Sequence, residues 1–113
     1  MAVKIPDPLK RRHVLESPPE GAKALAIAEA YLEEGRRLEA LLFLKYAEAQ
    51  DRLDTIYEEG IAEGDAFLVR ECAAAMEREI DGREWRRVAE AAAAQGKDTY
   101  AADAARQAER LGA

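Results

Sequence analysis

The four prolines of this chain all lie within its first 19 residues, at Pro6, Pro8, Pro18 and Pro19. Because proline removes a backbone donor and breaks helix interiors, everything after Pro19 is free to be helical. Of the 113 residues 25 are alanine, the best helix former, whereas only four Val, five Ile and two Thr favour strands. The sequence therefore predicts an all-α fold.

The position of the prolines also predicts the domain organisation. We expect a basic, proline-containing arm over residues 1–17 and a single helical domain over residues 18–113, since about 100 to 200 residues form one domain. Within the arm, Asp7 followed by Pro8 favours a short helix through Leu15.

Charge and cysteine content exclude several classes of partner. The formal net charge of -6 disfavours nucleic acid, and no apolar stretch approaches the roughly 18 residues of a membrane span. Cys72 is the one cysteine, so no disulfide can form within the chain. We therefore expect a cytoplasmic protein that does not enter a membrane.

Helix start and stop signals divide the domain into amphipathic segments. Ser17 predicts the first helix start, Asp81 with Glu84 forms a capping-box pattern, and Asp98 predicts the last start. Between Ala47 and Ile56 there is no stop signal, so residues 38–64 can form either two helices or one long helix. The other expected helices cover residues 18–34, 66–80, 82–95 and 99–111.

Three glycines, Gly35, Gly64 and Gly96, each lie between two amphipathic segments. In the first unit the small and large residues around the glycine are Ile27, Ala28, Tyr31, Ala40, Leu44 and Ala47. In the third unit they are Trp85, Val88, Ala89, Ala92, Ala101, Ala105 and Ala108.

This pattern resembles the tetratricopeptide repeat, in which Trp, Tyr, Gly and Ala positions recur in each helical hairpin. The middle unit departs from it, with Gly60 where a Tyr is expected and Val69 where an Ala is expected. The resemblance implies antiparallel hairpins stacked as a short superhelix, with units of about 22–51, 52–81 and 82–113. The alternative is a compact alanine-rich helical bundle.

The inventory of reactive side chains is poor: one His, one Ser, one Cys, two Thr and no Asn. His13 and Ser17 lack an acid to orient the His, and a buried thiol at Cys72 behaves as a small hydrophobe. Metal sites need several Cys or His, or helical Glu-x-x-His pairs. We therefore expect no enzyme, no catalytic residue, no metal and no cofactor.

In the repeat family that the chain resembles, ligands usually occupy a groove lined by the first helix of each unit. Glu29, Glu58 and Glu90 take equivalent positions there, which predicts a basic or amphipathic peptide or protein as partner, although three solvated glutamates would give the same pattern. The expected groove residues are Leu25, Glu29, Leu32, Glu33, Asp54, Glu58, Ile61, Arg86 and Glu90.

The arm carries a separate basic cluster, Lys10, Arg11, Arg12 and His13. This cluster can dock on the acidic body in cis or on a neighbouring subunit, or it can be an undocked leader. With no interleaved aromatic residue it is a poor nucleic-acid contact.

Two functions follow from these observations. The first is a non-enzymatic interaction module that binds a peptide or protein through its helical groove. The second is a self-associating structural bundle, which would bury Trp85 and Phe67 in a homo-oligomer, or a small regulatory subunit.

Overall fold

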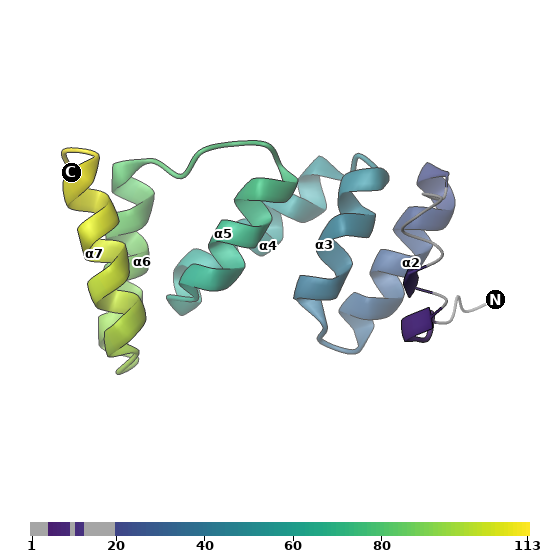
Figure 1. The fold of residues 1–113 in the computed structure, drawn as a ribbon, viewed down its shortest axis with the longest axis horizontal. Coiled ribbons are helices and arrows are strands. Elements are labelled where there is room, and N and C mark those ends of the chain that lie inside the picture. Colours follow the sequence, from purple (N-terminus) through teal and green to yellow (C-terminus); the bar gives the residue numbers. More distant parts are fainter. Residues whose placement is uncertain (1–4, 10, 13–19) are drawn as a thin grey trace. The chain divides into compact units, whose positions relative to one another are not determined.

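The computed structural model describes residues 5–9, 11–12 and 20–113, and this part of the chain contains helices and no strand. The all-α prediction is therefore confirmed (Figure 1). The chain forms two compact units, residues 1–53 and 54–113, and helix α4 begins in the first and continues in the second. The helices are α2 (Gly21–Glu33), α3 (Arg37–Tyr46), α4 (Gln50–Glu63), α5 (Ala66–Ala75), α6 (Gly82–Ala94) and α7 (Asp98–Arg110).

The first unit is built on the antiparallel pair α2 and α3. Ala24, Ala28 and Ala40 are fully buried, and such small side chains let helices approach closely. Beside them Tyr31 and Phe43 are also fully buried, with their rings stacked at 5.7 Å between centroids. Two aromatic rings thus supply the bulk that the alanines of this hairpin lack.

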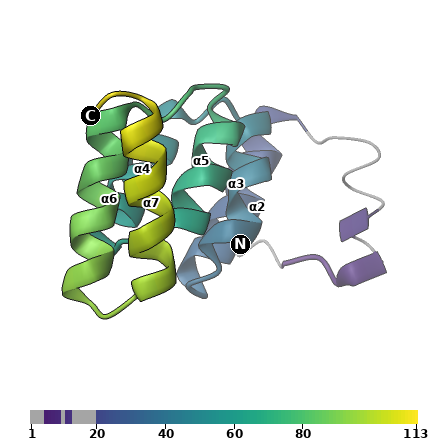
Figure 2. The same ribbon diagram turned by 60° about the vertical axis from the view of Figure 1, so that its left-hand side comes forward.

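The second unit contains two helix pairs, α4 with α5 and α6 with α7. Helices α6 and α7 lie side by side and antiparallel (Figure 2), with Val88, Ala92, Ala104 and Ala108 fully buried. Polar contacts join the two pairs. From the α6–α7 pair to α4 they link Arg87 to Glu58, Lys97 to the carbonyl of Glu63 and Gln95 to the carbonyl of Ala62. Arg70 of α5 also pairs with Asp103 of α7.

Helices α4 and α5 approach closely where the sequence departs from the repeat pattern. A Cβ added at Gly60 would lie 3.0 Å from Cγ2 of Val69 and 3.5 Å from Cδ2 of Leu68. The missing side chain of Gly60 therefore makes room for the larger Val69. The two departures in the middle unit face each other and compensate in volume.

Each of the helices α2 to α7 ends in the same way, with a residue in the left-handed region of the backbone. Gly35, Gly64, Gly96 and Gly112 have φ between 67° and 78° and follow α2, α4, α6 and α7. After α3 and α5 the position is held by glutamates, Glu48 with φ 54° and Glu77 with φ 53°. A chain reversal thus follows α3, which settles the open question in favour of two helices, α3 and α4.

Three predicted helix boundaries are wrong. Helix α2 begins at Gly21 after Glu20 rather than at the start signal of Ser17, which lies outside the described residues. Helix α7 is preceded by Lys97, so Asp98 is its first residue and not its cap. Helix α5 ends at Ala75, not at Ile80, because Glu77 reverses the backbone.

Other expectations of local structure hold. Asp81 accepts from the amide of Glu84 while the carboxylate of Glu84 accepts from the amide of Asp81, so the predicted capping box of α6 is confirmed. Of the short helix expected from Pro8 to Leu15, the described residues 8–9 and 11–12 are helical. No helix in the described residues is both long and apolar enough to cross a membrane.

Replacing Gly64 should be far more costly than replacing Gly96, although both have positive φ. An added Cβ at Gly64 would collide with the backbone of α6, 2.5 Å from Cα of Ala92 and 2.8 Å from the carbonyl carbon of Ala91, whereas Gly96 has open space. We expect Gly64→Ala to lower the free energy of unfolding by about 3 kcal/mol or more, from backbone strain plus overpacking. Gly96→Ala, the matched control, should cost about 1 kcal/mol. Urea denaturation followed by circular dichroism measures both, and equal losses would show that α6 does not pack against Gly64.

Replacing Glu48 with glycine should stabilise the protein. Glu48 carries the steric cost of a Cβ in the left-handed region, and glycine removes it. We expect Glu48→Gly to raise the free energy of unfolding by about 1 kcal/mol. Glu48→Ala removes the same charge but keeps the Cβ, and it should show no such gain. A stabilisation shared by both variants would mean that the charge of Glu48, not its backbone, is unfavourable.

Candidate functional site

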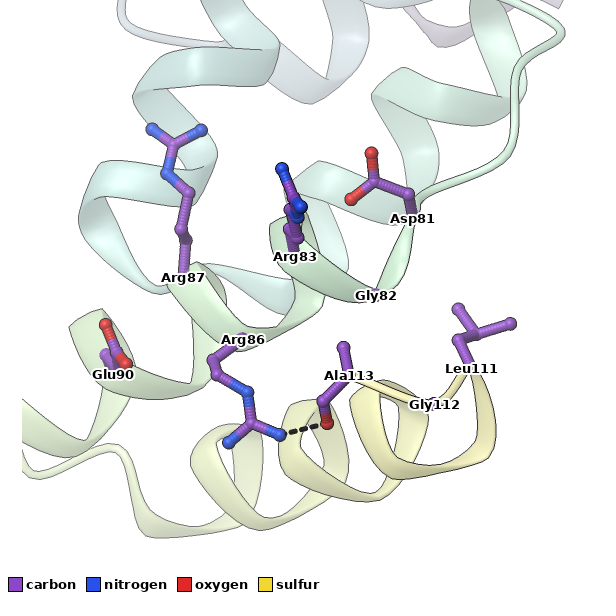
Figure 3. A pocket seen from close by; sticks show the side chains of 9 residues that line it. All are labelled: Asp81, Gly82, Arg83, Arg86, Arg87, Glu90, Leu111, Gly112 and Ala113. Carbon is purple, nitrogen blue, oxygen red and sulfur yellow. Dashed lines mark hydrogen bonds between the residues drawn. The ribbon is translucent and has the colours of Figure 1, made fainter.

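A hollow of about 710 Å³ opens in the second unit between the first turns of α6 and the turn that follows α7 (Figure 3). Arg83 and Arg87, one helical turn apart, extend from α6 in the same direction, and Arg86 reaches toward Ala113. The hollow is lined by Asp81, Gly82, Arg83, Arg86, Arg87, Glu90, Leu111, Gly112 and Ala113.

Local sequence explains why this hollow forms. The capping box fixes the first turn of α6, and left-handed Gly112 turns the chain back after α7, so that the amide of Ala113 bonds to the carbonyl of Ala108 at 2.9 Å. Gly82 allows the two segments to meet, since a Cβ there would lie 2.6 Å from that of Ala113. Gly82, Gly112 and Ala113 therefore contribute backbone and small side chains to the lining, beside the three arginines of α6.

The three arginines differ in what they already bind. Arg87 pairs with Glu58 at 3.0 Å, and Arg86 donates to the carbonyl oxygen of Ala113. Arg83 is exposed and has no hydrogen-bond or ion-pair partner among the described residues. Leu111, 54% exposed, lies beside them. The hollow thus offers an unpaired cation next to an apolar surface.

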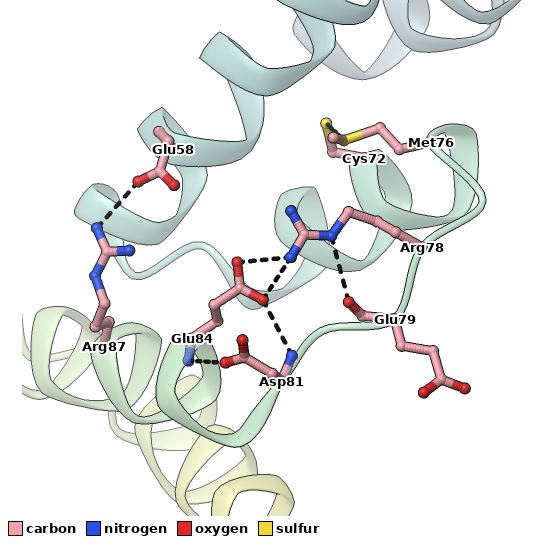
Figure 4. A network of polar contacts seen from close by, with 8 residues as sticks. All are labelled: Glu58, Cys72, Met76, Arg78, Glu79, Asp81, Glu84 and Arg87. Carbon is pink, nitrogen blue, oxygen red and sulfur yellow. Dashed lines mark hydrogen bonds and ion pairs between the residues drawn. The ribbon is translucent and has the colours of Figure 1, made fainter.

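A polar network holds the segment that leads into α6 (Figure 4). Arg78 donates two hydrogen bonds to the Glu84 carboxylate, at 2.7 and 2.9 Å, and its guanidinium lies 4.5 Å from the ring centroid of Tyr57. Both bonds come from one nitrogen, Nη2, and a hydrogen bond between charged groups is stronger than one between neutral groups. The network therefore anchors the loop 76–81 and fixes the N-terminal end of the hollow.

Two buried groups beside this network have raised pKa values. Burial, reinforced by the Asp54 carboxylate, raises the pKa of the Cys72 thiol to about 11. Burial and then the nearby Glu84 carboxylate raise the pKa of the Tyr57 hydroxyl, which has no hydrogen-bond partner in the described part of the chain. Both groups stay neutral at physiological pH, so Cys72 is not an activated nucleophile.

The predicted groove residues divide between the two units, and their charges are partly compensated. In the first unit Glu29 pairs with Arg52 at 2.7 Å, and Leu25 lines a smaller hollow of about 320 Å³. In the second unit Glu58 pairs with Arg87, while Arg86 and Glu90 lie together in the arginine-lined hollow. The remaining predicted residues are placed as follows: Leu32 is half-buried, Glu33 and Asp54 are exposed, and Ile61 is buried at 1% and offers no groove surface.

Sequence reasoning missed Arg83, Arg87 and Leu111 as parts of one site. The run Arg83, Arg86, Arg87 gave a signal, since residues at i, i+3 and i+4 are neighbours on a helix surface. What no pattern indicated is that the turn after α7 folds back against Gly82 and brings Leu111 there.

The basic arm contacts the body through Arg11. Its guanidinium donates to the hydroxyl of Tyr31 at 2.7 Å and to the carbonyl of Glu39 at 3.3 Å. Arg12 is exposed, and Lys10 and His13 lie outside the described residues. His13 and Ser17, the pair considered for catalysis, therefore both lie outside the described residues. Of the candidate reactive side chains only Cys72 is described, and its raised pKa keeps the thiol neutral. Within the described residues no three or more His, Cys, Asp or Glu side chains lie together in a way that could hold a metal ion.

The raised pKa of Cys72 should make stability fall at alkaline pH. A thiol whose pKa is higher in the folded than in the unfolded chain stabilises the fold below its unfolded pKa, and this contribution is lost as pH rises toward about 11. We expect Cys72→Ala to reduce the loss of unfolding free energy between about pH 8 and about pH 10.5 by about 2 kcal/mol. Urea titrations of both proteins at the two pH values measure it. Identical losses would show that Cys72 ionises freely in the fold.

Comparison of the chain with protein-family models, with curated proteins and with solved structures gives no match.

Proposed function

We propose that this protein is a non-enzymatic interaction module that binds an acidic, amphipathic segment of a partner protein at the arginine-lined hollow. The observation that carries the proposal is Arg83, an exposed arginine without a partner in the described residues, beside exposed Leu111. A carboxylate of the partner would pair with Arg83, and an apolar side chain would cover Leu111.

The sign of the partner's charge differs from that expected of a glutamate groove. Glu29 and Glu58 already pair with Arg52 and Arg87, so two of the three glutamates have cationic partners in this chain. A basic ligand would have to compete with those arginines. An acidic ligand at the hollow meets a cation that is still available.

We also propose that the module is similar to tetratricopeptide repeats, and the arrangement of the second unit supports this. There α4 contacts α6 through Glu58 and Arg87, and α5 contacts α7 through Arg70 and Asp103. Equivalent helices of successive hairpins lie next to one another in stacked repeats of this kind. We propose this repeat-like arrangement for the hairpins of the second unit, and we place the module in the cytoplasm, where a lone buried cysteine needs no disulfide partner.

Self-association is the second candidate. Trp85 does not favour it, because it is only 5% exposed and Arg70 covers its ring at 4.9 Å. Phe67 does favour it: this ring is 49% exposed on α5. Sedimentation velocity on the full chain separates the two candidate functions. A protein that stays monomeric at high concentration would exclude self-association.

The experiment that tests the hollow is a selection of short random peptides displayed on phage against the full chain, followed by affinity measurements on the enriched sequences. We expect enriched peptides to combine Asp or Glu with a large apolar residue. Arg83→Glu with Arg86→Glu should weaken their binding by about tenfold or more, since a charge-assisted hydrogen bond contributes about 1.5–3 kcal/mol.

A double variant with the same change in charge serves as the control. Arg106→Glu with Arg110→Glu alters two exposed arginines of α7 that do not line the hollow. It should leave peptide binding within about twofold, once long-range electrostatics are screened by salt. Enrichment of basic peptides, or equal losses in both double variants, would refute the site.

A further inference from the structure

The α2–α3 hairpin carries a second feature with the geometry of a ligand site, apart from the arginine-lined hollow. The Arg11 guanidinium lies 5.1 Å from the ring centroids of both Tyr31 and Phe43. It also donates to the hydroxyl of Tyr31 at 2.7 Å and to the backbone carbonyl of Glu39 at 3.3 Å. We call this set of groups, Tyr31, Phe43 and the Glu39 carbonyl, the aromatic notch.

The notch matches the chemistry of arginine specifically. A guanidinium is planar, stacks on aromatic faces and presents several donors in a fixed fork, whereas an ammonium group is a compact point charge. In the notch one nitrogen of the fork meets a hydroxyl and another meets a carbonyl, while the plane lies near two rings. Lysine could supply the charge but not both bonds together with the stacking.

The notch is also rigid and held from the protein side. The two rings are stacked on each other and fully buried. A second guanidinium, Arg36, lies 4.9 Å from the Tyr31 ring centroid and is fixed by the Glu39 carboxylate, with Nε to Oε1 at 2.7 Å. The Glu39 carboxylate thus binds Arg36, and the backbone carbonyl of Glu39 accepts from Arg11.

Arg11 makes the hydrogen bonds to the notch, and the apolar side chains of the same segment are only partly buried. Ile5 and Pro6 are half-buried, whereas Leu9 is 81% exposed and Pro8 is exposed as well. The backbone bond from Arg11 to Asp7, 2.7 Å, is internal to the segment. A tethered ligand of this kind acts at an effective concentration of about millimolar, which an untethered ligand with further contacts can exceed.

We propose that the aromatic notch is a recognition site for an arginine side chain, which Arg11 fills in cis and which an arginine-bearing segment of a partner protein fills in its place. The arm then acts as a built-in competitor. It lowers the apparent affinity of the partner by the fraction of time that Arg11 occupies the notch. This site lies in the first unit and does not depend on the arginine-lined hollow of the second.

The test uses the full chain and, as probe, a fluorescein-labelled peptide with the sequence of residues 5–12, Ile-Pro-Asp-Pro-Leu-Lys-Arg-Arg. Arg11→Ala in the chain empties the notch, and we expect this variant to bind the peptide at least about tenfold more tightly than the unmodified chain in fluorescence anisotropy. Arg12→Ala is the matched control: it removes a neighbouring exposed arginine, leaves Arg11 in place and should bind like the unmodified chain.

Two further measurements test whether the notch binds arginine specifically. A peptide in which the residue equivalent to Arg11 is lysine should bind the emptied chain at least about tenfold more weakly. Adding Tyr31→Phe to the emptied chain removes the hydroxyl and keeps the ring, and it should weaken binding about fivefold or more. If Arg11→Ala fails to fold, Arg11→Lys provides a chain with the fork removed.

Three results would overturn the proposal. The first is equal peptide binding by the unmodified and emptied chains, or none by either at millimolar peptide. The second is equal binding of the arginine and lysine peptides. The third is a dimer of the unmodified chain that dissociates with Arg11→Ala, because the arm of a second copy would then fill the notch.

Discussion

The fold depends on how each helix is brought to an end. After each of the helices α2 to α7, one residue enters the left-handed region and the next amide bonds back to a carbonyl five residues earlier, at 2.9–3.0 Å. This Schellman closure satisfies carbonyls that a helix end leaves unpaired, and it turns the chain sharply. Short antiparallel pairs such as α2 with α3 and α6 with α7 follow from it directly.

The closures also explain which parts of the fold could be predicted from the sequence. Gly35, Gly64 and Gly96 marked turns that the structure contains, because glycine is the residue that adopts positive φ without strain. Glu48 and Glu77 take the same conformation, yet glutamate ordinarily indicates the interior or surface of a helix. For this reason the sequence did not decide whether a helix ends after α3, and it predicted an end of α5 that lies too far along the chain. The residue type at these two positions therefore gives no sign of the chain reversal that the backbone makes there.

The sequence also does not predict which residues contact each other, either through packing or through charge. Gly60 and Val69 each depart from the repeat pattern when considered singly, but in the structure each compensates for the other across α4 and α5. The candidate groove residues show the same limit. The sequence predicted that Arg86 and Glu90 line one site, and both line the same hollow, but it did not predict the ion pair between Glu58 and Arg87. The exposure of a residue can be predicted from its place on a helix face, but its partner depends on a helix far along the chain.

Arginine side chains cover buried aromatic rings in a core that is otherwise rich in small alanine side chains. Aromatic residues make up only 6% of the chain, and guanidinium groups cover three of the largest buried rings, with Arg11 and Arg36 at Tyr31, Arg78 at Tyr57 and Arg70 at Trp85. Such contacts bury the aliphatic stem and stabilise the ring face while the charge remains near solvent. Arg36, Arg70 and Arg78 therefore have a structural use, and Arg11 occupies the aromatic notch. Arg83 contacts no ring and no carboxylate in the described residues, and it is this difference, rather than basic charge as such, that distinguishes an arginine available to a partner from one that holds the fold.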